Sequence, residues 1–314
     1  MVAAASGGTT APRTAFVFCG GAGLGAVQVG QLRALVERGI RPDVVTGTSS
    51  GALNALVYAS DPGSEAVDRL ERLWLSVRRR DLFTLRPWTV GRGLVGSSTA
   101  FAANAGLRRL LVSSLPVAAL EDAKIPVAIV LADTVTRRPV VFRSGPAVEI
   151  LLASSAVPGL FPPIELEGRQ YIDGGLVADP PVGPAVEMGA TDVYVLPVGW
   201  PLTEPYTGNA MMRVADSVDW LCWRIAEFEM ERWASECRIE LVPSPSTRNI
   251  APFDLRSAKW LIDQAYALTT TWLDDPDHDA RPGPGAPQGT GRLVPLISDV
   301  TRRGRRLAMR VRRA

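Results

Sequence analysis

The sequence predicts an α/β protein whose central sheet is mainly parallel and is covered by helices on both faces. From Thr14 to Val198, short apolar runs typical of buried strands alternate with segments whose apolar residues recur at helical spacing. Glycine-rich turns follow three of the strands, at Gly20–Gly25, Gly47–Gly51 and Gly174–Gly175. Because parallel strands end at the same edge of a sheet, these turns are expected to converge there.

Two strands and three helices are expected in the first part of the chain. The strands are Thr14–Cys19 and Asp43–Thr46, and the helices are Ala26–Arg38, Ala52–Ala59 and Ser64–Arg80. Each strand is an apolar, β-branched run that leads directly into glycines. The first helix ends at Gly39, and the third carries an apolar stripe typical of one buried face.

The remaining elements follow a glycine-rich loop at Arg86–Ser98. Strands are expected at Ile125–Ala132, Pro139–Phe142 and Val193–Val198, with a short strand, Tyr171–Ile172, before Asp173. Helices are expected at Phe101–Ser114, Pro146–Ser154, Asn209–Glu236 and Leu255–Leu273. The apolar stripe of the long helix, which we expect to face the core, consists of Val214, Val218, Leu221, Ile225 and Phe228, with Trp220, Trp223 and Trp233 beside it. A lid or an acyl-chain pocket is the alternative role for that helix.

The chain has 314 residues, 46% hydrophobic and 21% charged, which suffices for one large core. We expect an N-terminal segment, one α/β domain, a Pro/Gly-rich linker and an Arg-rich tail. Their bounds are 1–13, 14–273 (motif core 14–198, helical part 207–273), 274–292 and 293–314. Three cysteines, no signal-peptide pattern at the start and no apolar run of ~18 residues favour a reduced, cytoplasmic protein.

The composition excludes several kinds of site. His278 is the only histidine, so a zinc site built from several histidines is excluded. No Gly-Lys-Ser/Thr occurs, which excludes a Walker A loop, and no Ser-x-x-Lys occurs, which excludes the β-lactamase pattern. We expect no cofactor and no metal. The net charge of +2 gives no reason to expect a nucleic-acid partner.

The strongest motif is Gly47-Thr48-Ser49-Ser50-Gly51, between a predicted strand and a predicted helix. This GxSxG pattern in that context is typical of a nucleophile elbow, a tight turn that exposes the central serine and needs glycine two residues to either side. It also places Ser49 at a helix N-terminus, which favours developing negative charge. Ser49 is therefore the candidate nucleophile, with a plain glycine-rich turn as the alternative.

A serine nucleophile needs a base, and the only histidine lies in the predicted linker. Asp173 follows the apolar pair Tyr171-Ile172 and precedes Gly174 and Gly175, so its carboxylate can be presented at a strand end. Burial would raise the pKa of this carboxyl group from its usual ~3.9 and make it a better base. The sequence thus favours a Ser49–Asp173 dyad without histidine.

The glycine-rich turn after the first strand can supply backbone donors for an oxyanion. Its residues Gly20, Gly21, Ala22 and Gly23 allow close approach and direct N–H groups at an anion, and Gly25 supports the turn. The stretch from Gly21 to Ala26 also fits the dinucleotide pattern GxGxxG/A. Nicotinamide binding is disfavoured because the second strand ends without the acidic residue that would hold the ribose.

Together and in this order, CGGAGLGAVQVG, GTSSG and DGG resemble the patatin-like phospholipase family. The segment Ala153–Pro163 (ASSAVPGLFPP) resembles the family's stretch before its aspartate, so the resemblance runs from about Thr14 to Val198. It implies a patatin-like fold, Ser49 as nucleophile, Asp173 as base, the amides around Gly21–Gly23 as oxyanion hole, and no metal.

Three positions depart from the family pattern. Ala22 replaces the third glycine of the loop, which is tolerable with a negative φ, and Leu24 replaces the usual basic residue. Losing that basic side chain weakens the binding of a phosphate head group, so a neutral ester or a modified substrate becomes the better expectation. The family's Asn-x-Pro appears here as Asp179-Pro180-Pro181, which implies a different local hydrogen bond.

The sequence therefore predicts a serine acyl hydrolase that cleaves fatty-acyl esters of lipids. A catalytically weak lipid-binding or regulatory protein and an acyltransferase with the same dyad remain alternatives, and the oligomeric state is not predicted. Seven arginines between Arg302 and Arg313 give the tail two interpretations: a solvated end, or peripheral attachment to anionic membranes.

Overall fold

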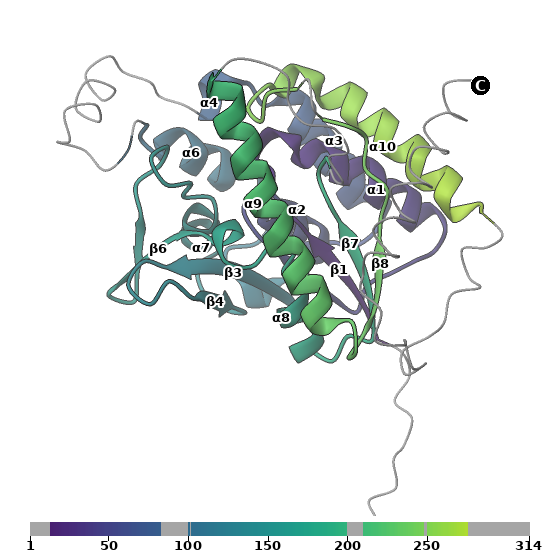
Figure 1. Cartoon of the computed structure of the whole chain (residues 1–314). Coiled ribbons are helices and arrows are strands. Elements are labelled where there is room, and N and C mark those ends of the chain that lie inside the picture. The colour runs from purple at the N-terminus through teal and green to yellow at the C-terminus, as the bar shows by residue number, and fades with distance from the viewer. Residues whose placement is uncertain (1–12, 83–99, 101, 200–209, 248–249, 276–314) are drawn as a thin grey trace, which may run out of the picture.

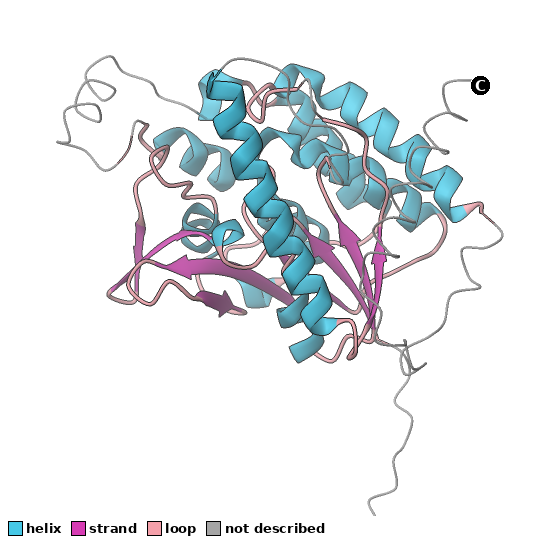
Figure 2. Cartoon of the chain, viewed as in Figure 1, coloured by secondary structure: helices cyan, strands magenta, loops and turns pink. Residues whose placement is uncertain are grey.

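The computed structural model describes residues 13–82, 100, 102–199, 210–247 and 250–275, which form one sheet between two layers of helices (Figures 1 and 2). Nearly all of the predicted N-terminal segment and linker, the Arg-rich tail and the predicted loop at 86–98 lie outside the described residues. The predicted membrane contact of Arg302–Arg313 falls on that tail.

The sheet has eight strands, and its parallel part forms one continuous block. The strands are β1 (Thr14–Phe18), β2 (Val44–Gly47), β3 (Val127–Asp133), β4 (Pro139–Phe142), β5 (Ile164–Leu166), β6 (Arg169–Asp173), β7 (Asp192–Leu196) and β8 (Arg238–Leu241). Their order is β5-β6-β3-β2-β1-β7-β8, with β4 also paired to β3. The five strands β3, β2, β1, β7 and β8 run parallel to one another. The strands β4 and β6 pair antiparallel with β3, and β5 pairs antiparallel with β6. The predicted mainly parallel sheet is confirmed.

Alternate residues of the central strand β1 point to opposite faces of the sheet. Phe16 and Phe18 belong to the larger core cluster, whereas Ala15 and Val17 belong to a smaller one. The larger cluster is covered by α1 (Ala26–Glu37), α2 (Ser50–Ser60), α3 (Ser64–Ser76), α7 (Ala147–Ser154) and α10 (Ala258–Leu273). The smaller one is covered by α8 (Val182–Glu187) and α9 (Ala210–Trp233). The large aromatic side chains therefore fill the thicker helical layer.

Some boundaries differ from the prediction for local reasons. The predicted helix Ser64–Arg80 ends at Ser76, because Val77 is extended, and a short helix α4 (Arg79–Leu82) follows. The predicted helix from Phe101 begins only at Ala105, as α6 (Ala105–Ser114). The strands β5 and β8 and the helix α8 were not predicted, since elements this short show too little periodicity.

The orientation predicted for the long helix is wrong for Leu221 and Phe228, whereas Ile225 of the same stripe is half-buried. Leu221 and Phe228 of the predicted core-facing stripe are 64% and 62% exposed, and Trp220 is 71% exposed. The buried face instead carries Ala226 and Met230, which pack on the smaller core cluster. The helix thus faces the core, but with a different side from the one that carries the predicted stripe.

No helix among the described residues has the length and hydropathy needed to cross a membrane.

Candidate active site

Ser49 occupies a sharp turn between β2 and α2 where neighbouring backbones leave no room for side chains. Its φ is 53° and its ψ is −127°, a strained conformation for a residue with a side chain. A Cβ at Gly51 would lie 2.4 Å from the carbonyl oxygens of Phe18 and Cys19, and one at Gly47 would lie 2.7 Å from the oxygen of Gly51. Both glycines of the motif are therefore required: Gly51 because the backbone at the end of β1 lies against it, and Gly47 because the backbone of the turn itself does.

Ser154, the last residue of α7, stabilises the strained turn through a hydrogen bond. The backbone N–H of Ser49 donates to Ser154 Oγ at 2.9 Å, and that hydroxyl donates to the carbonyl oxygen of Val130 at 2.8 Å. Ser154 is completely buried. Ser154 was not a predicted site residue. It ends the predicted helix Pro146–Ser154 and lies in the family-like segment Ala153–Pro163, but nothing in the local pattern points to Ser49.

The side chains of Ser49 and Asp173 are in direct contact. Ser49 Oγ donates to Asp173 Oδ2 at 2.7 Å, and the N–H of Gly175 donates to the other oxygen, Oδ1, at 2.9 Å. Both residues are buried at the carboxyl ends of their strands, β2 and β6. Burial raises the pKa of Asp173 to about 6, although the hydrogen bonds from Ser49 and Gly175 oppose that rise. A carboxylate tuned this way is ionised at neutral pH and still accepts a proton.

Gly174 explains why β6 can come so close to the turn. A Cβ at this position would lie 2.2 Å from the carbonyl oxygen of Val130 and 2.6 Å from Thr48 Oγ1. Any side chain there would push Asp173 away from Ser49. The glycine after the aspartate is thus a packing requirement of the dyad geometry.

The glycine loop offers fewer free donors than the sequence suggested. The N–H of Gly20 donates to Asp179, and the N–H of Gly23 donates to the carbonyl oxygen of Pro252 at 2.7 Å. Within the described part of the chain, no hydrogen bond engages the amides of Gly21 and Ala22. Of the four predicted oxyanion donors, the amides of Gly20 and Gly23 thus have hydrogen-bond partners within the chain, and the assignment of an oxyanion hole stays a prediction.

Two residues of the glycine loop, Ala22 and Leu24, differ from the family pattern, and each difference has a structural consequence. Ala22 has a φ of 52°, so the condition of a negative φ is not met, and the left-handed conformation costs about 1–2 kcal/mol relative to glycine. Leu24, at the position of the family's basic residue, is buried in the larger core cluster. It belongs to the core and presents no charge to a ligand.

Asp179 is a buried residue of the site that the sequence analysis noted only as a departure. Both of its carboxylate oxygens lie 3.1 Å from the backbone nitrogen of Gly20. Burial raises its pKa well above the usual range, and the neighbouring charge of Asp173 raises it further. No pattern in the sequence indicates that the two carboxyl groups meet.

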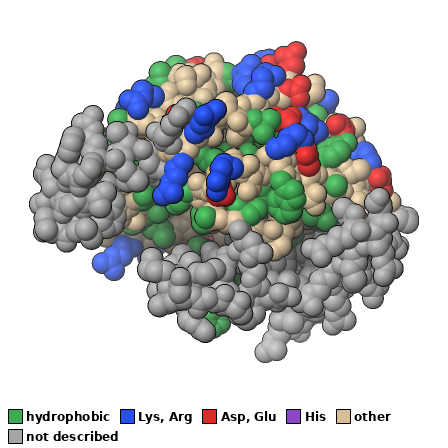
Figure 3. All heavy atoms as spheres, turned by 90° about the horizontal axis from the view of Figure 1, so that it is seen from above, with side chains coloured by type: hydrophobic (Ala, Val, Ile, Leu, Met, Phe, Trp, Pro, Cys, Tyr) green, Lys and Arg blue, Asp and Glu red, His purple; other side chains and the backbone are tan. Residues whose placement is uncertain are grey.

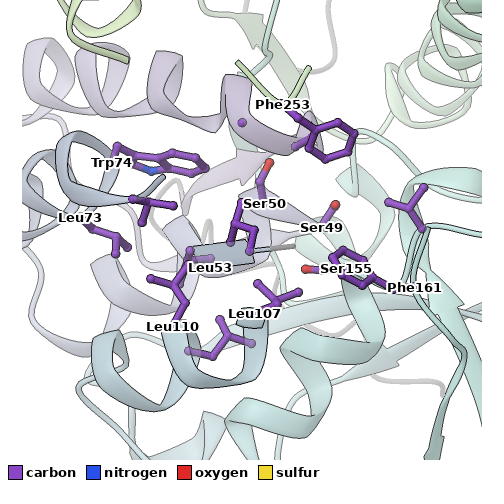
Figure 4. Close-up of a pocket in the computed structure, with 16 residues that line it drawn as sticks. Ser49, Ser50, Leu53, Leu73, Trp74, Leu107, Leu110, Ser155, Phe161 and Phe253 are labelled. Atoms are coloured by element: carbon purple, nitrogen blue, oxygen red, sulfur yellow. The ribbon is translucent and has the colours of Figure 1, made fainter. Parts of the chain in front are cut away.

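Ser49 lines an apolar cavity. Figure 4 shows Phe161 and Phe253 beside Ser49, with Leu73, Trp74, Leu107 and Leu110 extending away from it. Ala22 and Gly23 line the same space. None of the described residues of α9 lines it, so the alternative role of α9 as an acyl-pocket helix gains no support.

Trp74 forms a fixed part of the cavity wall. Its Nε1–H donates to Asn54 Oδ1 at 2.9 Å, and the amide of Asn54 donates to Gln28 Oε1 and to the carbonyl oxygen of Gly25. These groups are buried, so breaking the network would leave unsatisfied polar atoms. The wall is therefore rigid where the indole meets the glycine loop.

The face of the molecule that Figure 3 shows carries charges of both signs. Seen from above, the described surface has Lys and Arg side chains beside hydrophobic ones, with the acidic side chains mainly toward the right of the view (Figure 3). The described residues contain no group of three or more His, Cys, Asp or Glu arranged to hold a metal ion. His278 lies outside the described residues.

Comparison with known proteins gives a family match that covers the site. The family model "Patatin-like phospholipase" matches residues 16–186, which include Ser49, Asp173 and the glycine loop. "Lysophospholipase NTE1" of Mycosarcoma maydis is 31% identical over 58% of this chain and 9% of its own length. "Uncharacterized NTE family protein Rv1063c" of Mycobacterium tuberculosis is 29% identical over 58% of this chain and 48% of its own length. The chain therefore spans less than half the length of either relative.

Among solved structures, VipD from Legionella pneumophila aligns with 94% of this chain and 74% of its own, at 12% identity and a TM-score of 0.37. A score this low adds nothing to the fold seen directly here.

Replacing Ser154 tests whether this residue supports the turn. Ser154→Ala leaves the buried N–H of Ser49 without its acceptor and the carbonyl of Val130 with only the long bond from Thr48 Oγ1, so the free energy of unfolding should fall by about 1–3 kcal/mol. Urea denaturation measures this change. Ser60→Ala is the matched control, because its hydroxyl only adds a bond to the helical carbonyl of Leu56 and its loss should cost less than about 1 kcal/mol. Equal losses for the two variants would contradict the role of Ser154.

Proposed function

The chain belongs to the patatin-like phospholipase family, and we propose that it is a serine acyl hydrolase that cleaves fatty-acyl esters of lipids. The observation that carries the proposal is the direct hydrogen bond from Ser49 Oγ to Asp173 Oδ2, made at the mouth of an apolar cavity. Lipid acyl hydrolysis fits the family; the particular residues and the class of ester are our assignment.

In the proposed reaction, Ser49 Oγ attacks the ester carbonyl carbon while Asp173 Oδ2 takes the hydroxyl proton. The amides of Gly21 and Ala22 stabilise the negative charge that forms on the carbonyl oxygen, a contribution on the order of 3 kcal/mol per donor. Collapse of this intermediate breaks the ester bond, and the leaving alcohol takes the proton from Asp173. Water then attacks the acyl-enzyme, gives a proton to Asp173, and the fatty acid leaves as Ser49 regains its proton.

The cavity fits the acyl chain of such an ester. Its walls are almost entirely aliphatic and aromatic, so burial of methylene groups favours binding by about 0.8 kcal/mol for each CH₂ that is fully removed from water. None of the described residues that line the cavity is a lysine or an arginine, and Leu24 is buried in the core. We therefore assign esters without a strict requirement for an anionic head group.

The dyad assignment is tested by removing each reacting group. Ser49→Ala and Asp173→Asn should each lower hydrolysis of 4-nitrophenyl butyrate by a factor on the order of 10⁴ or more. Ser49→Ala should also abolish labelling by a fluorophosphonate probe. Circular dichroism and thermal unfolding check that both variants are folded. Hydrolysis by Ser49→Ala at the wild-type rate would refute the proposed function, and labelling without acyl release to water would favour an acyltransferase.

The pKa of Asp173 predicts the acid side of the pH profile. The base acts in its ionised form, so kcat/KM should rise with pH up to about 6 and level off above it. Below that pH the rate should fall about tenfold for each pH unit, because each unit leaves a tenth as much carboxylate. Initial rates in buffers of constant ionic strength measure the profile. A midpoint near the ordinary aspartate value of ~3.9 would mean that burial does not tune this group.

The acyl-chain assignment is tested by a polar substitution in the cavity wall. Leu107→Gln places an amide among apolar side chains, so kcat/KM for 4-nitrophenyl laurate should fall on the order of tenfold while that for the acetate ester changes by less than about twofold. Leu75→Gln is the matched control, since Leu75 lies on the surface of α3 and is 48% exposed. An equal fall for both esters would show that Leu107 does not contact the chain.

A further inference from the structure

Two buried carboxyl groups meet beneath the glycine loop. A Cβ placed on Gly175 would lie 3.2 Å from Asp173 Oδ1 and 3.9 Å from Asp179 Oδ2. A Cβ placed on Gly20 would lie 3.2 Å from the Cβ of Ser49 and 3.3 Å from Asp179 Oδ2. Asp179 therefore lies about one residue's width from both members of the dyad, close enough for the charge of Asp173 to act on it.

Nothing in the described part of the chain neutralises this pair with a positive charge. The groups that act on Asp179 are the N–H of Gly20, the thiol of Cys19 and the carboxylate of Asp173, and none of them is a cation. Those that act on Asp173 are Ser49 and Gly175. Two carboxylates so close together in a buried space cannot both be ionised at low cost.

The hydrogen bonds decide which carboxyl group carries the charge. Asp173 receives one donor on each oxygen, from the Ser49 hydroxyl and from Gly175, which stabilises its ionised form. The two oxygens of Asp179 share the single N–H of Gly20, with only the weak thiol donor of Cys19 beside it. Burial also raises the pKa of Cys19, so its thiol adds no charge.

We propose that Asp179 is a positioning residue that acts in its neutral form: its carboxyl group holds Gly20, and hence the start of the oxyanion loop, without adding a second negative charge beside Asp173. This inference rests on the proposed function. The amide it holds is the one directly before Gly21 and Ala22, whose N–H groups point to the reacting oxygen in the proposed reaction. An ionised Asp179 would oppose the negative charge that those amides stabilise.

Infrared spectroscopy tests the protonation state without relying on activity. At pH 8 a protonated carboxyl group gives a C=O stretching band that ionised carboxylates lack, and Asp173 is ionised there. We expect this band in the wild type, its loss in Asp179→Asn and its retention in Glu229→Gln. Glu229 is the matched control because it is another buried carboxyl group of raised pKa, far from the dyad in the sequence. A band that is absent from the wild type, or unchanged in Asp179→Asn, overturns the neutral form.

Kinetics of two variants test the positioning. Asp179→Asn keeps an oxygen that can accept from Gly20, so kcat should stay within about threefold of the wild type and the acid midpoint near pH 6 should not move, because a neutral group exerts no net charge on Asp173. A midpoint lower by a pH unit or more would mean that Asp179 is ionised in the wild type.

Asp179→Ala removes the acceptor, and kcat should fall on the order of tenfold with KM unchanged. Equal kcat in the alanine and asparagine variants would overturn positioning through Gly20. Should the alanine variant not fold, Asp179→Leu at matched volume replaces it, with the same expectation. The infrared result stands even if the chain proves not to hydrolyse esters, so failure of this inference and failure of the proposed function are distinguishable.

Discussion

The site depends on backbone contacts too close for any side chain, made where β1, β2 and β6 end. Gly51 lies against the carbonyls that end β1, and Gly174 lies against Val130 of β3. β6 runs antiparallel to β3 and ends beside Leu131, inside β3, and these contacts bring Asp173, which is 124 residues away in sequence, within hydrogen-bond distance of Ser49. A methyl group at either glycine would separate the two reacting groups, so the chemistry is fixed by steric exclusion before any electrostatic term applies.

The same contacts support an arrangement that is locally unfavourable. Ser49 is held in a strained conformation, Ala22 has a positive φ, and two carboxyl groups are buried without a described cation. Such features cost on the order of 1–3 kcal/mol each and persist only where the surroundings fix them. Two buried hydrogen bonds hold these residues in place: the N–H of Ser49 donates to Ser154, and the N–H of Gly20 donates to Asp179. Strain and support therefore come from different segments of the chain.

Much of the fold followed from local patterns, whereas the contacts around the reacting groups did not. Apolar runs that end in glycine identified the strands β1 and β2 and the turn at Ser49, because the turn requires those residue types. Ser154 and Asp179 were not assigned a role, since a buried polar residue is recognised only by its partners, which lie far away in sequence. The buried face of α9 was predicted wrongly for Leu221 and Phe228, because apolar periodicity marks a helix but does not show which of its apolar residues the sheet covers.

A lone carboxylate as base also limits the path of the proton in the proposed reaction. Asp173 Oδ1 accepts from the N–H of Gly175, so only Oδ2 faces Ser49. One oxygen must then take the proton from Ser49, pass it to the leaving alcohol, and later take a proton from water. Histidine can divide such tasks between two nitrogens, one of which is held by an orienting group. Here the backbone amide of Gly175 performs the orienting role, and a Cβ on that residue would lie only 3.2 Å from the oxygen it orients.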